Sequence, residues 1–88
     1  MSGRTAALAI VNPTAGGGAT HEVFRRAEHR VLDRLGALDV VFTERHGHAE
    51  EIARRAIGRG VKRVLVAGGD GTINEVVNGW FDAEGSPL

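Results

Sequence analysis

The sequence predicts an α/β fold, a three-layer sandwich in which helices pack on the faces of a parallel sheet. Three short runs are dominated by apolar residues, which is typical of strands covered on both faces. Each run is followed by a stretch whose apolar residues recur every three or four positions, the spacing of an amphipathic helix. Only short turns separate these segments. We therefore expect the order β-α-β-α-β-α, with right-handed crossovers between parallel strands.

The first strand is predicted at residues 6–11. Every residue of this run is apolar, so the strand should be central in the sheet. Pro13 interrupts the strand ladder, and the glycines at 16–18 loosen the chain that follows. The Asn12 amide and the Thr14 hydroxyl are suited either to hold a ligand oxygen or to form an Asx-type turn that only shapes the connection. The sequence leaves both interpretations open.

Two further strand–helix units follow. A helix is predicted at residues 20–35, with Gly36 as its stop signal. The second strand is predicted at 38–43 and is closed by the polar segment 44–48. A second helix is predicted at 49–59 because its apolar residues recur at helical spacing. These residues are Ala49, Ile52, Ala53, Ala56 and Ile57.

The third predicted strand, residues 61–67, leads into a glycine-rich turn that contains one acid, Asp70. Gly68, Gly69 and Gly71 lack a Cβ, so the backbone can turn sharply and a ligand can come close. A helix that opens at this turn would point free N–H groups and the positive end of its dipole at the turn, which favours phosphate. A glycine-rich turn that serves only tight packing is the alternative.

This last helix is predicted to begin at Thr72. Glu75 stands three residues later, which is the spacing of a capping box. Asp70 competes with Thr72 for the capping role. One apolar face is expected along the helix, formed by Ile73, Val76, Val77 and Trp80.

In a parallel sheet the carboxyl ends of all strands meet at one rim, where ligands bind. Residues 12–18, Thr43 and residues 68–72 should therefore form one candidate site. Thr43 either contacts a nucleotide or simply ends a strand, where Thr is favoured. Asp70 would repel a bare phosphate, so we expect a cation such as Mg²⁺ between them. The glycines are not followed by Gly-Lys-Ser/Thr, which excludes a Walker loop.

Composition limits the classes of function. The chain has 88 residues, enough for one domain, with 11 basic and 11 acidic side chains, so its charge favours neither nucleic acid nor an anionic membrane. Without cysteine, disulfides and thiolate metal sites are excluded. His46 and His48 lie two positions apart on a predicted loop, as metal ligands can, but no third ligand is evident near them in the sequence. With no apolar run of about 20 residues and no signal-peptide layout, a cytoplasmic protein is expected.

The chain resembles the N-terminal part of the diacylglycerol kinase catalytic domain. That family includes bacterial lipid kinases and sphingosine kinases, and its fold is shared with NAD kinase. The resemblance is carried by Asn-Pro-Thr-Ala-Gly at 12–16, by Thr43, and by Gly-Gly-Asp-Gly-Thr-Ile-Asn-Glu-Val-Val-Asn-Gly at 68–79. It implies transfer of the γ-phosphoryl group of ATP to a lipid hydroxyl, with Mg²⁺ as the metal.

The resemblance also implies roles for individual residues. Asp70 would be the catalytic residue and would hold Mg²⁺ near the phosphates. The nucleotide would be bound by residues of the three loops: Asn12, Pro13, Thr14, Ala15, Gly16, Thr43, Gly68, Gly69, Gly71, Thr72, Ile73, Asn74 and Glu75.

The chain departs from the family pattern in two respects. Ala15 stands where the family often has Ser, and Gly17 or Gly18 stands where it has a basic residue, so one hydroxyl and one positive charge are lacking. Family members also continue into a mostly β C-terminal domain that holds the lipid and the general base. We therefore expect residues 1–88 to be a truncated nucleotide-binding domain, inactive alone, ending in a linker at 85–88.

The expected partners are a nucleotide and, through the absent domain, a lipid acceptor. Nucleic acid is not expected, nor is a transmembrane segment. Peripheral membrane contact and self-association through an unpaired sheet edge remain open. Two alternatives to a lipid kinase also remain open: a non-catalytic module that binds a nucleotide or a partner chain, and a kinase of a soluble acceptor such as NAD.

Overall fold

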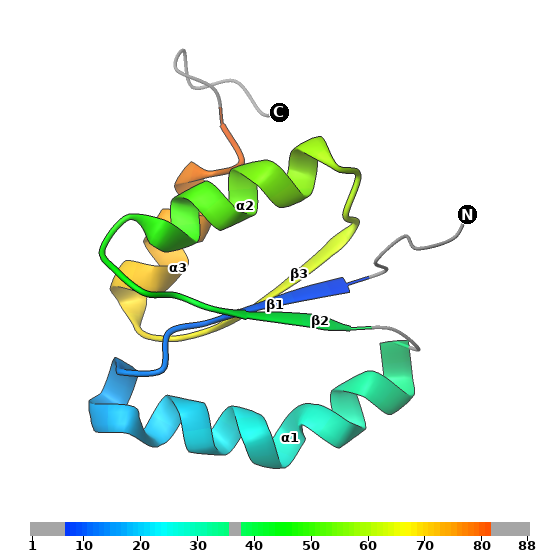
Figure 1. The fold of residues 1–88 in the computed structure, drawn as a ribbon, viewed down its shortest axis with the longest axis vertical. Helices are drawn as coiled ribbons and strands as arrows, with labels where there is room; N and C mark the ends of the chain where they lie inside the picture. Colours follow the sequence, from blue (N-terminus) through cyan, green and yellow to red (C-terminus); the bar gives the residue numbers. More distant parts are fainter. Residues whose placement is uncertain (1–6, 36–37, 82–88) are drawn as a thin grey trace.

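The computed structural model describes residues 7–35 and 38–81, and it contains strands and helices in the predicted alternation (Figure 1). The first strand is followed by a short 3₁₀ turn, η1, before the first helix. The elements are β1 (Ala7–Val11), η1 (Ala15–Gly18), α1 (Ala19–Leu35), β2 (Asp39–Phe42), α2 (His48–Gly58), β3 (Arg63–Ala67) and α3 (Asp70–Asn78).

The three strands form one parallel sheet in the order β2-β1-β3. Leu8 of β1 pairs with Asp39 of β2 on one side and with Val64 of β3 on the other. Every residue of β1 is buried. The prediction that the first strand is central is confirmed, because an apolar run of this kind has neighbours on both edges and cover on both faces.

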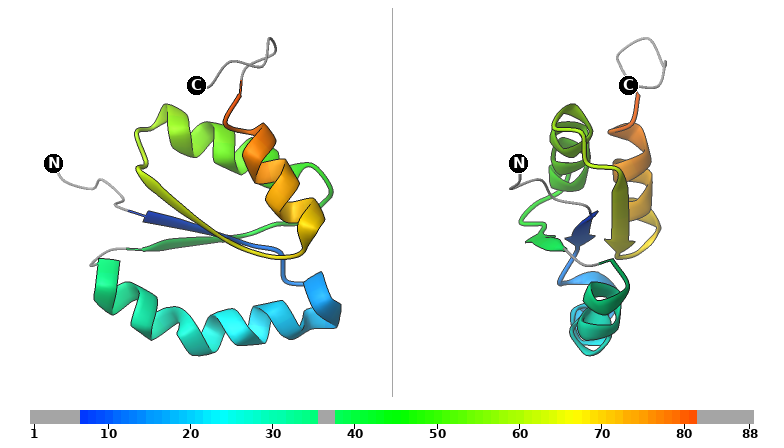
Figure 2. Two further views of the ribbon diagram at one scale, coloured as in Figure 1. Left: turned by 180° about the vertical axis from the view of Figure 1, so that it is seen from behind. Right: turned by 90° about the vertical axis from the view of Figure 1, so that its right-hand side faces the viewer.

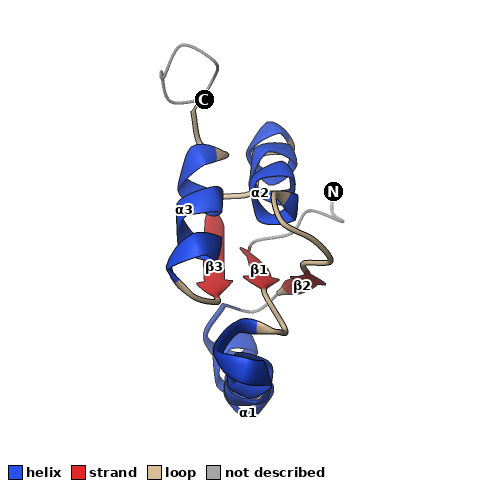
Figure 3. Ribbon diagram, turned by 90° about the vertical axis from the view of Figure 1, so that its left-hand side faces the viewer, coloured by secondary structure: helices blue, strands red, loops and turns tan. Residues whose placement is uncertain are grey.

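Helices cover both faces of the sheet. α1 lies on one face, while α2 and α3 lie together on the other, as the two views of Figure 2 and the side view of Figure 3 show. The predicted three-layer α/β sandwich is therefore confirmed. None of the helices in the described residues combines the length and the apolarity needed to cross a bilayer.

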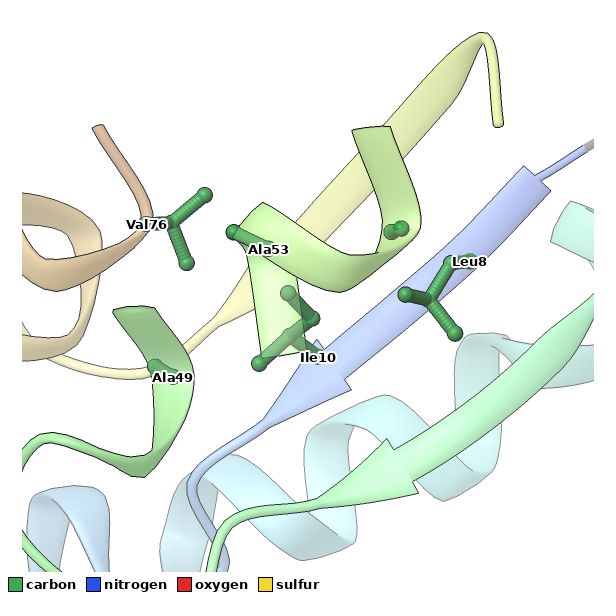
Figure 4. Close-up of a cluster of buried hydrophobic side chains, with 6 residues drawn as sticks. Leu8, Ile10, Ala49, Ala53 and Val76 are labelled. Atoms are coloured by element: carbon green, nitrogen blue, oxygen red, sulfur yellow. The ribbon is translucent and has the colours of Figure 1, made fainter. Parts of the chain in front are cut away.

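Side chains of β1 alternate between two apolar clusters, as the pleat of a strand requires. Leu8 and Ile10 point toward α2 and α3, and Ala9 and Val11 pack with Phe24 of α1. Figure 4 shows the first cluster between β1 and the helix pair. The remaining buried members of that cluster are Ala49, Ala53, Ala56 and Val76.

The contact between α2 and α3 is close because small residues form it. A Cβ added at Gly79 would lie 2.7 Å from the backbone oxygen of Glu50 and 2.8 Å from the Cβ of Ala53. Consequently α3 buries the side that includes Val76 and leads to Gly79. The predicted apolar face is wrong in part, since Ile73 is 47% and Val77 49% exposed. Trp80 packs, partly buried, against the first cluster.

Element boundaries differ from the prediction by a few residues. Val61 is not part of the third strand, because its backbone N–H donates to the carbonyl oxygen of Ala56 at 3.0 Å. It therefore closes the end of α2, and β3 begins at Arg63. The predictions at Ala6, at Gly36 and at residues 85–88 lie outside the described residues.

Candidate functional site

A pocket of about 440 Å³ opens at the rim of the sheet where the strands end. Its walls come from the segments that directly follow β1, β2 and β3, together with the first turns of α2 and α3. Parallel topology brings these distant segments together at one rim. The lining residues are Asn12, Thr14, Ala15, Gly16, Thr43, Glu44, Arg45, His46, Ala49, Gly69, Gly71, Thr72 and Glu75.

Asn12 joins the segment after β1 to the first turns of α3. Its Oδ1 accepts hydrogen bonds from the backbone N–H and from the hydroxyl of Thr14, at 3.1 and 2.9 Å. Its Nδ2 donates to Oγ1 of Thr72 at 3.1 Å. The Asx-type turn, one of the two interpretations that the sequence left open, is therefore present. The Asn12 side chain also ties the loop after β1 to α3.

α3 begins at Asp70, with Gly69 in an extended conformation before it. The predicted capping box is wrong. Thr72 lies inside the helix, where it is buried and accepts the hydrogen bond from Asn12. Neither Asp70 nor Thr72 occupies the N-cap position, which belongs to Gly69. The glycine turn lets the backbone enter the helix at once, so the Thr-x-x-Glu spacing falls too late to cap it.

Glu75 caps α2 instead of its own helix. Its Oε2 accepts a hydrogen bond from the backbone N–H of Gly47 at 3.1 Å, and its Oε1 accepts one from Ala49 at 3.2 Å. The Glu75 side chain is only 17% exposed, and Nδ1 of His46 lies 3.4 Å from Oε2. The carboxylate thus satisfies two N–H groups that the start of a helix leaves without an intrahelical partner.

Residues 43–46 form a wall of the pocket, and of these only Thr43 was predicted to belong to the site. The Thr43 N–H donates to the carbonyl oxygen of Val11 at 2.8 Å, and the Glu44 N–H donates to Nδ1 of His48 at 2.9 Å. Parallel strands direct the segments that follow them to one rim, so the polar residues directly after Thr43 could also have been predicted to lie there. The lining residues missed were Glu44, Arg45, His46 and Ala49.

The structure brings most of the predicted site residues to the pocket. Those that line it are Asn12, Thr14, Ala15, Gly16, Thr43, Gly69, Gly71, Thr72 and Glu75. The others do not line it: Pro13, Gly68, Asp70, Ile73 and Asn74. Asp70 is exposed at the first position of α3, between two glycines that do line the pocket.

The glycines after β3 differ in what surrounds them. A Cβ at Gly68 would lie 2.7 Å from the Cβ and Oγ1 of Thr72, so the chain itself requires a glycine there. Apart from its chain neighbours and the nearby backbone of α3, a Cβ at Gly69 or at Gly71 would meet no atom of the described residues within 4 Å. All three have ordinary negative φ angles or extended backbone, so none is needed for a left-handed turn.

Arg45 carries the permanent positive charge among the residues that line the pocket. Its guanidinium donates to both carboxylate oxygens of Glu51, at 3.1 and 3.0 Å. This hydrogen bonding, with the attraction between the two charges, lowers the pKa of Glu51 from its ordinary value of 4.5. Arg45 therefore stands at the rim already paired with an acid, and it does not stand in for the basic residue that Gly17 and Gly18 lack.

The described residues contain no group of three or more His, Asp or Glu side chains arranged to hold a metal ion. Mg²⁺ does not need such a group, because it is commonly held by one or two carboxylates together with substrate phosphates and waters. The exposed carboxylate of Asp70 is suited to be one of these carboxylate ligands, with phosphate and water supplying the others. It does not fit a metal held by the protein alone.

A family model, related protein sequences and solved structures all relate this chain to lipid kinases. The family model for the diacylglycerol kinase catalytic domain matches residues 6–88. A diacylglycerol kinase of Staphylococcus haemolyticus is 41% identical over 88 residues, an alignment that covers 96% of this chain and 26% of that protein. Sphingoid long-chain bases kinase 1 of Arabidopsis thaliana is 38% identical over 74 residues, covering 82% of this chain and 10% of that protein.

A crystal structure of a diacylglycerol kinase from Bacillus anthracis superimposes with a TM-score of 0.78 at 28% sequence identity. The superposition covers 100% of this chain and 32% of that one. The chain thus spans about a quarter of the length of the bacterial diacylglycerol kinases it matches.

Proposed function

The chain belongs to the diacylglycerol kinase catalytic domain family, and from this membership we propose that it forms part of the ATP site of a lipid kinase. The reaction is transfer of the γ-phosphoryl group of ATP to a lipid hydroxyl such as that of diacylglycerol. The acceptor oxygen bonds to the γ-phosphorus, the bond to the β–γ bridging oxygen breaks, and the hydroxyl proton passes to a base, leaving ADP and a phospholipid.

The observation that carries this proposal is the open space around Gly69 and Gly71. Both line the pocket, yet no contact among the residues that the structure describes requires a glycine at either position. Both lie where α3 begins, so backbone N–H groups and the positive end of the helix dipole are directed to that space. A bound phosphate group that approaches this backbone closely explains why side chains are absent there.

Charge neutralisation is the main chemical requirement of phosphoryl transfer. In the proposed site, the N-terminus of α3 supplies positive potential around the triphosphate. A magnesium ion held with the nucleotide would supply further positive charge to offset that of the phosphates. Asp70 would orient that ion and is the proposed catalytic carboxylate, because it stands in the first turn of the same helix.

We propose that the lipid acceptor and the base that takes its proton are held by residues outside this chain. The pocket is formed by three loops and the starts of two helices, and its lining includes no large apolar side chain against which an acyl chain could pack. The 88-residue chain alone would then bind nucleotide without transferring phosphate.

Titration calorimetry with ATP and ADP, with and without Mg²⁺, tests the nucleotide site. We expect binding that depends on Mg²⁺ and is lost in Asp70→Ala without loss of the fold as judged by circular dichroism. Absence of heat, together with absence of thermal stabilisation by nucleotide, would contradict the proposal.

The acceptor is tested with the protein as its gene encodes it, using diacylglycerol, sphingosine and NAD in parallel. Phosphorylation of a lipid is expected. Phosphorylation of NAD alone would instead identify a kinase of a soluble acceptor. Nucleotide binding without any phosphorylated product would identify a non-catalytic binding module.

A further inference from the structure

Two helix N-termini face the pocket, and they differ in how their N–H groups are used. α2 follows Gly47 and α3 follows Gly69, so neither N-cap residue has a side chain that can cap its helix. The free N–H groups and the dipole of a helix favour an anion at its N-terminus. At α2 this anion is the carboxylate of Glu75, a residue of α3.

The geometry of this contact engages both oxygens of the carboxylate. Oε2 accepts the hydrogen bond from the N–H of Gly47, and Oε1 accepts the one from Ala49. One turn earlier on α3, the hydroxyl of Thr72 accepts the hydrogen bond from Asn12. Two side chains three positions apart on α3 therefore reach two different walls of the pocket, the segment after β1 and the segment after β2.

We infer that Glu75 is a positioning residue: its carboxylate fills the anion position at the N-terminus of α2 and, through Gly47, fixes residues 43–46 as one wall of the pocket. Each of its oxygens already accepts a backbone hydrogen bond, so the role inferred for it is to act through these neighbours. A phosphate at α2 would meet this carboxylate and be repelled. The start of α3 is left as the phosphate position, a consequence that rests on the proposed function.

The inference is tested first by nuclear magnetic resonance on the protein as its gene encodes it. In Glu75→Ala, hydrogen exchange of the Gly47 and Ala49 amides should become about tenfold faster, because each amide loses its acceptor. Acetate has the atoms that Glu75→Ala removes, so adding it should restore the chemical shifts of both amides. Glu22→Gln is the matched control, since Glu22 is an exposed carboxylate on α1 that pairs only loosely with Arg26, at 4.0 Å.

A second variant keeps the inference testable if Glu75→Ala does not fold. Glu75→Gln preserves the shape of the side chain but has a single carbonyl oxygen, so one of the two amides should keep its slow exchange and the other should lose it. Unchanged exchange of both amides in this variant would overturn the inference. Acetate shifts of the same size in the wild type and in Glu75→Ala would also overturn it.

The nucleotide measurement separates this inference from the proposed function. If the wild type binds ATP, Glu75→Ala should bind it at least tenfold more weakly, and acetate should restore most of that affinity. Acetate should leave the ATP affinity of Glu22→Gln unchanged. An ATP affinity that does not change in Glu75→Ala would overturn the positioning role. If the wild type does not bind ATP, the proposed function fails, and the amide exchange still decides whether Glu75 fills the α2 position.

Discussion

The three glycines around the start of α3 look alike in sequence but have different surroundings in the structure. Gly68 is required because Thr72 occupies the space of its missing side chain, and Thr72 in turn holds Asn12. Gly69 and Gly71 have open space instead. The first glycine therefore serves the stability of the chain, while the other two border the open space proposed for the nucleotide, and substitutions can tell these roles apart.

Gly71→Ala should raise stability and lower nucleotide affinity. Gly71 lies within α3 and has room for a Cβ, so alanine should stabilise the protein by about 0.5–1 kcal/mol through better helix propensity. The added methyl group would enter the pocket and weaken ATP binding by about tenfold, or about 1.4 kcal/mol. Urea denaturation and calorimetry measure the two effects.

Gly58→Ala provides the matched control, because Gly58 lies at the end of α2 with no atom within 4 Å of an added Cβ and does not line the pocket. It should leave the ATP affinity unchanged. Wild-type affinity in Gly71→Ala would show that no ligand approaches this part of the backbone.

The ion pair of Arg45 with Glu51 predicts a small pH dependence of stability. Because the pKa of Glu51 is lower in the folded than in the unfolded chain, the pair stabilises the fold above the ordinary pKa of 4.5 and this contribution is lost as the pH falls through the folded value. The pair is partly exposed, so high salt should weaken it.

Comparing the wild type with Glu51→Gln by urea denaturation across this pH range checks the expectation. The difference in stability between the two proteins should be constant near neutral pH and should shrink in acid. A difference that grows as the pH falls would contradict a lowered pKa of Glu51 in the folded chain.

At the scale of the elements, α3 combines three contacts: its N-terminus faces the pocket, its Thr72 and Glu75 hold two pocket walls, and its end packs on α2. The α2–α3 packing depends on Gly79. The nearest atom to an added Cβ there is a backbone oxygen, that of Glu50, which cannot move away as a flexible side chain would. The two helices can therefore approach only when position 79 has no side chain.

Gly79→Ala should destabilise the protein by about 1–3 kcal/mol because it forces α2 and α3 apart. The shift is measured as a lower midpoint of urea denaturation, with Gly58→Ala as the control in which the same methyl group meets open space. Equal stability of Gly79→Ala and the wild type would mean that α2 and α3 can move apart without any loss of stability.

The strands, the helices and the shared rim could be predicted because they depend on local apolar patterns and on the topology of parallel sheets. The role of Glu75 could not. Locally, Thr72 and Glu75 have the spacing of a capping box, and nothing in the sequence indicates that Gly47, in another unit, will donate to the carboxylate. The exposure of Ile73 and Val77 could not be predicted for the same reason, since close helix packing at Gly79 decides which side of α3 is buried.

The molecule as a whole depends on one strand for its core. β1 contributes to both apolar clusters, and its Ile10 is fully buried. A small domain has a net stability of only about 5–15 kcal/mol. A single truncation in β1 can therefore remove a large share of the total.

Ile10→Val should cost about 0.5–1.5 kcal/mol, and Ile10→Ala about 2–5 kcal/mol, by loss of buried surface and creation of a cavity. Val23→Ala, at an exposed position of α1, should change stability by less than about 0.5 kcal/mol. Urea denaturation followed by circular dichroism provides all three values. Similar losses in Ile10→Ala and Val23→Ala would mean that β1 is not the centre of the core.

The strand order β2-β1-β3 also affects how the protein is made. β1 leaves the ribosome before β2 and β3 but lies between them, so it has no neighbour until β2 emerges and no complete pairing until Ala67 has been synthesised. Until β3 is in place, the most apolar strand therefore has at least one free edge, which can pair with other chains. Aggregation through β1 during translation is therefore the hazard that this strand order creates, and it ends when β3 is in place.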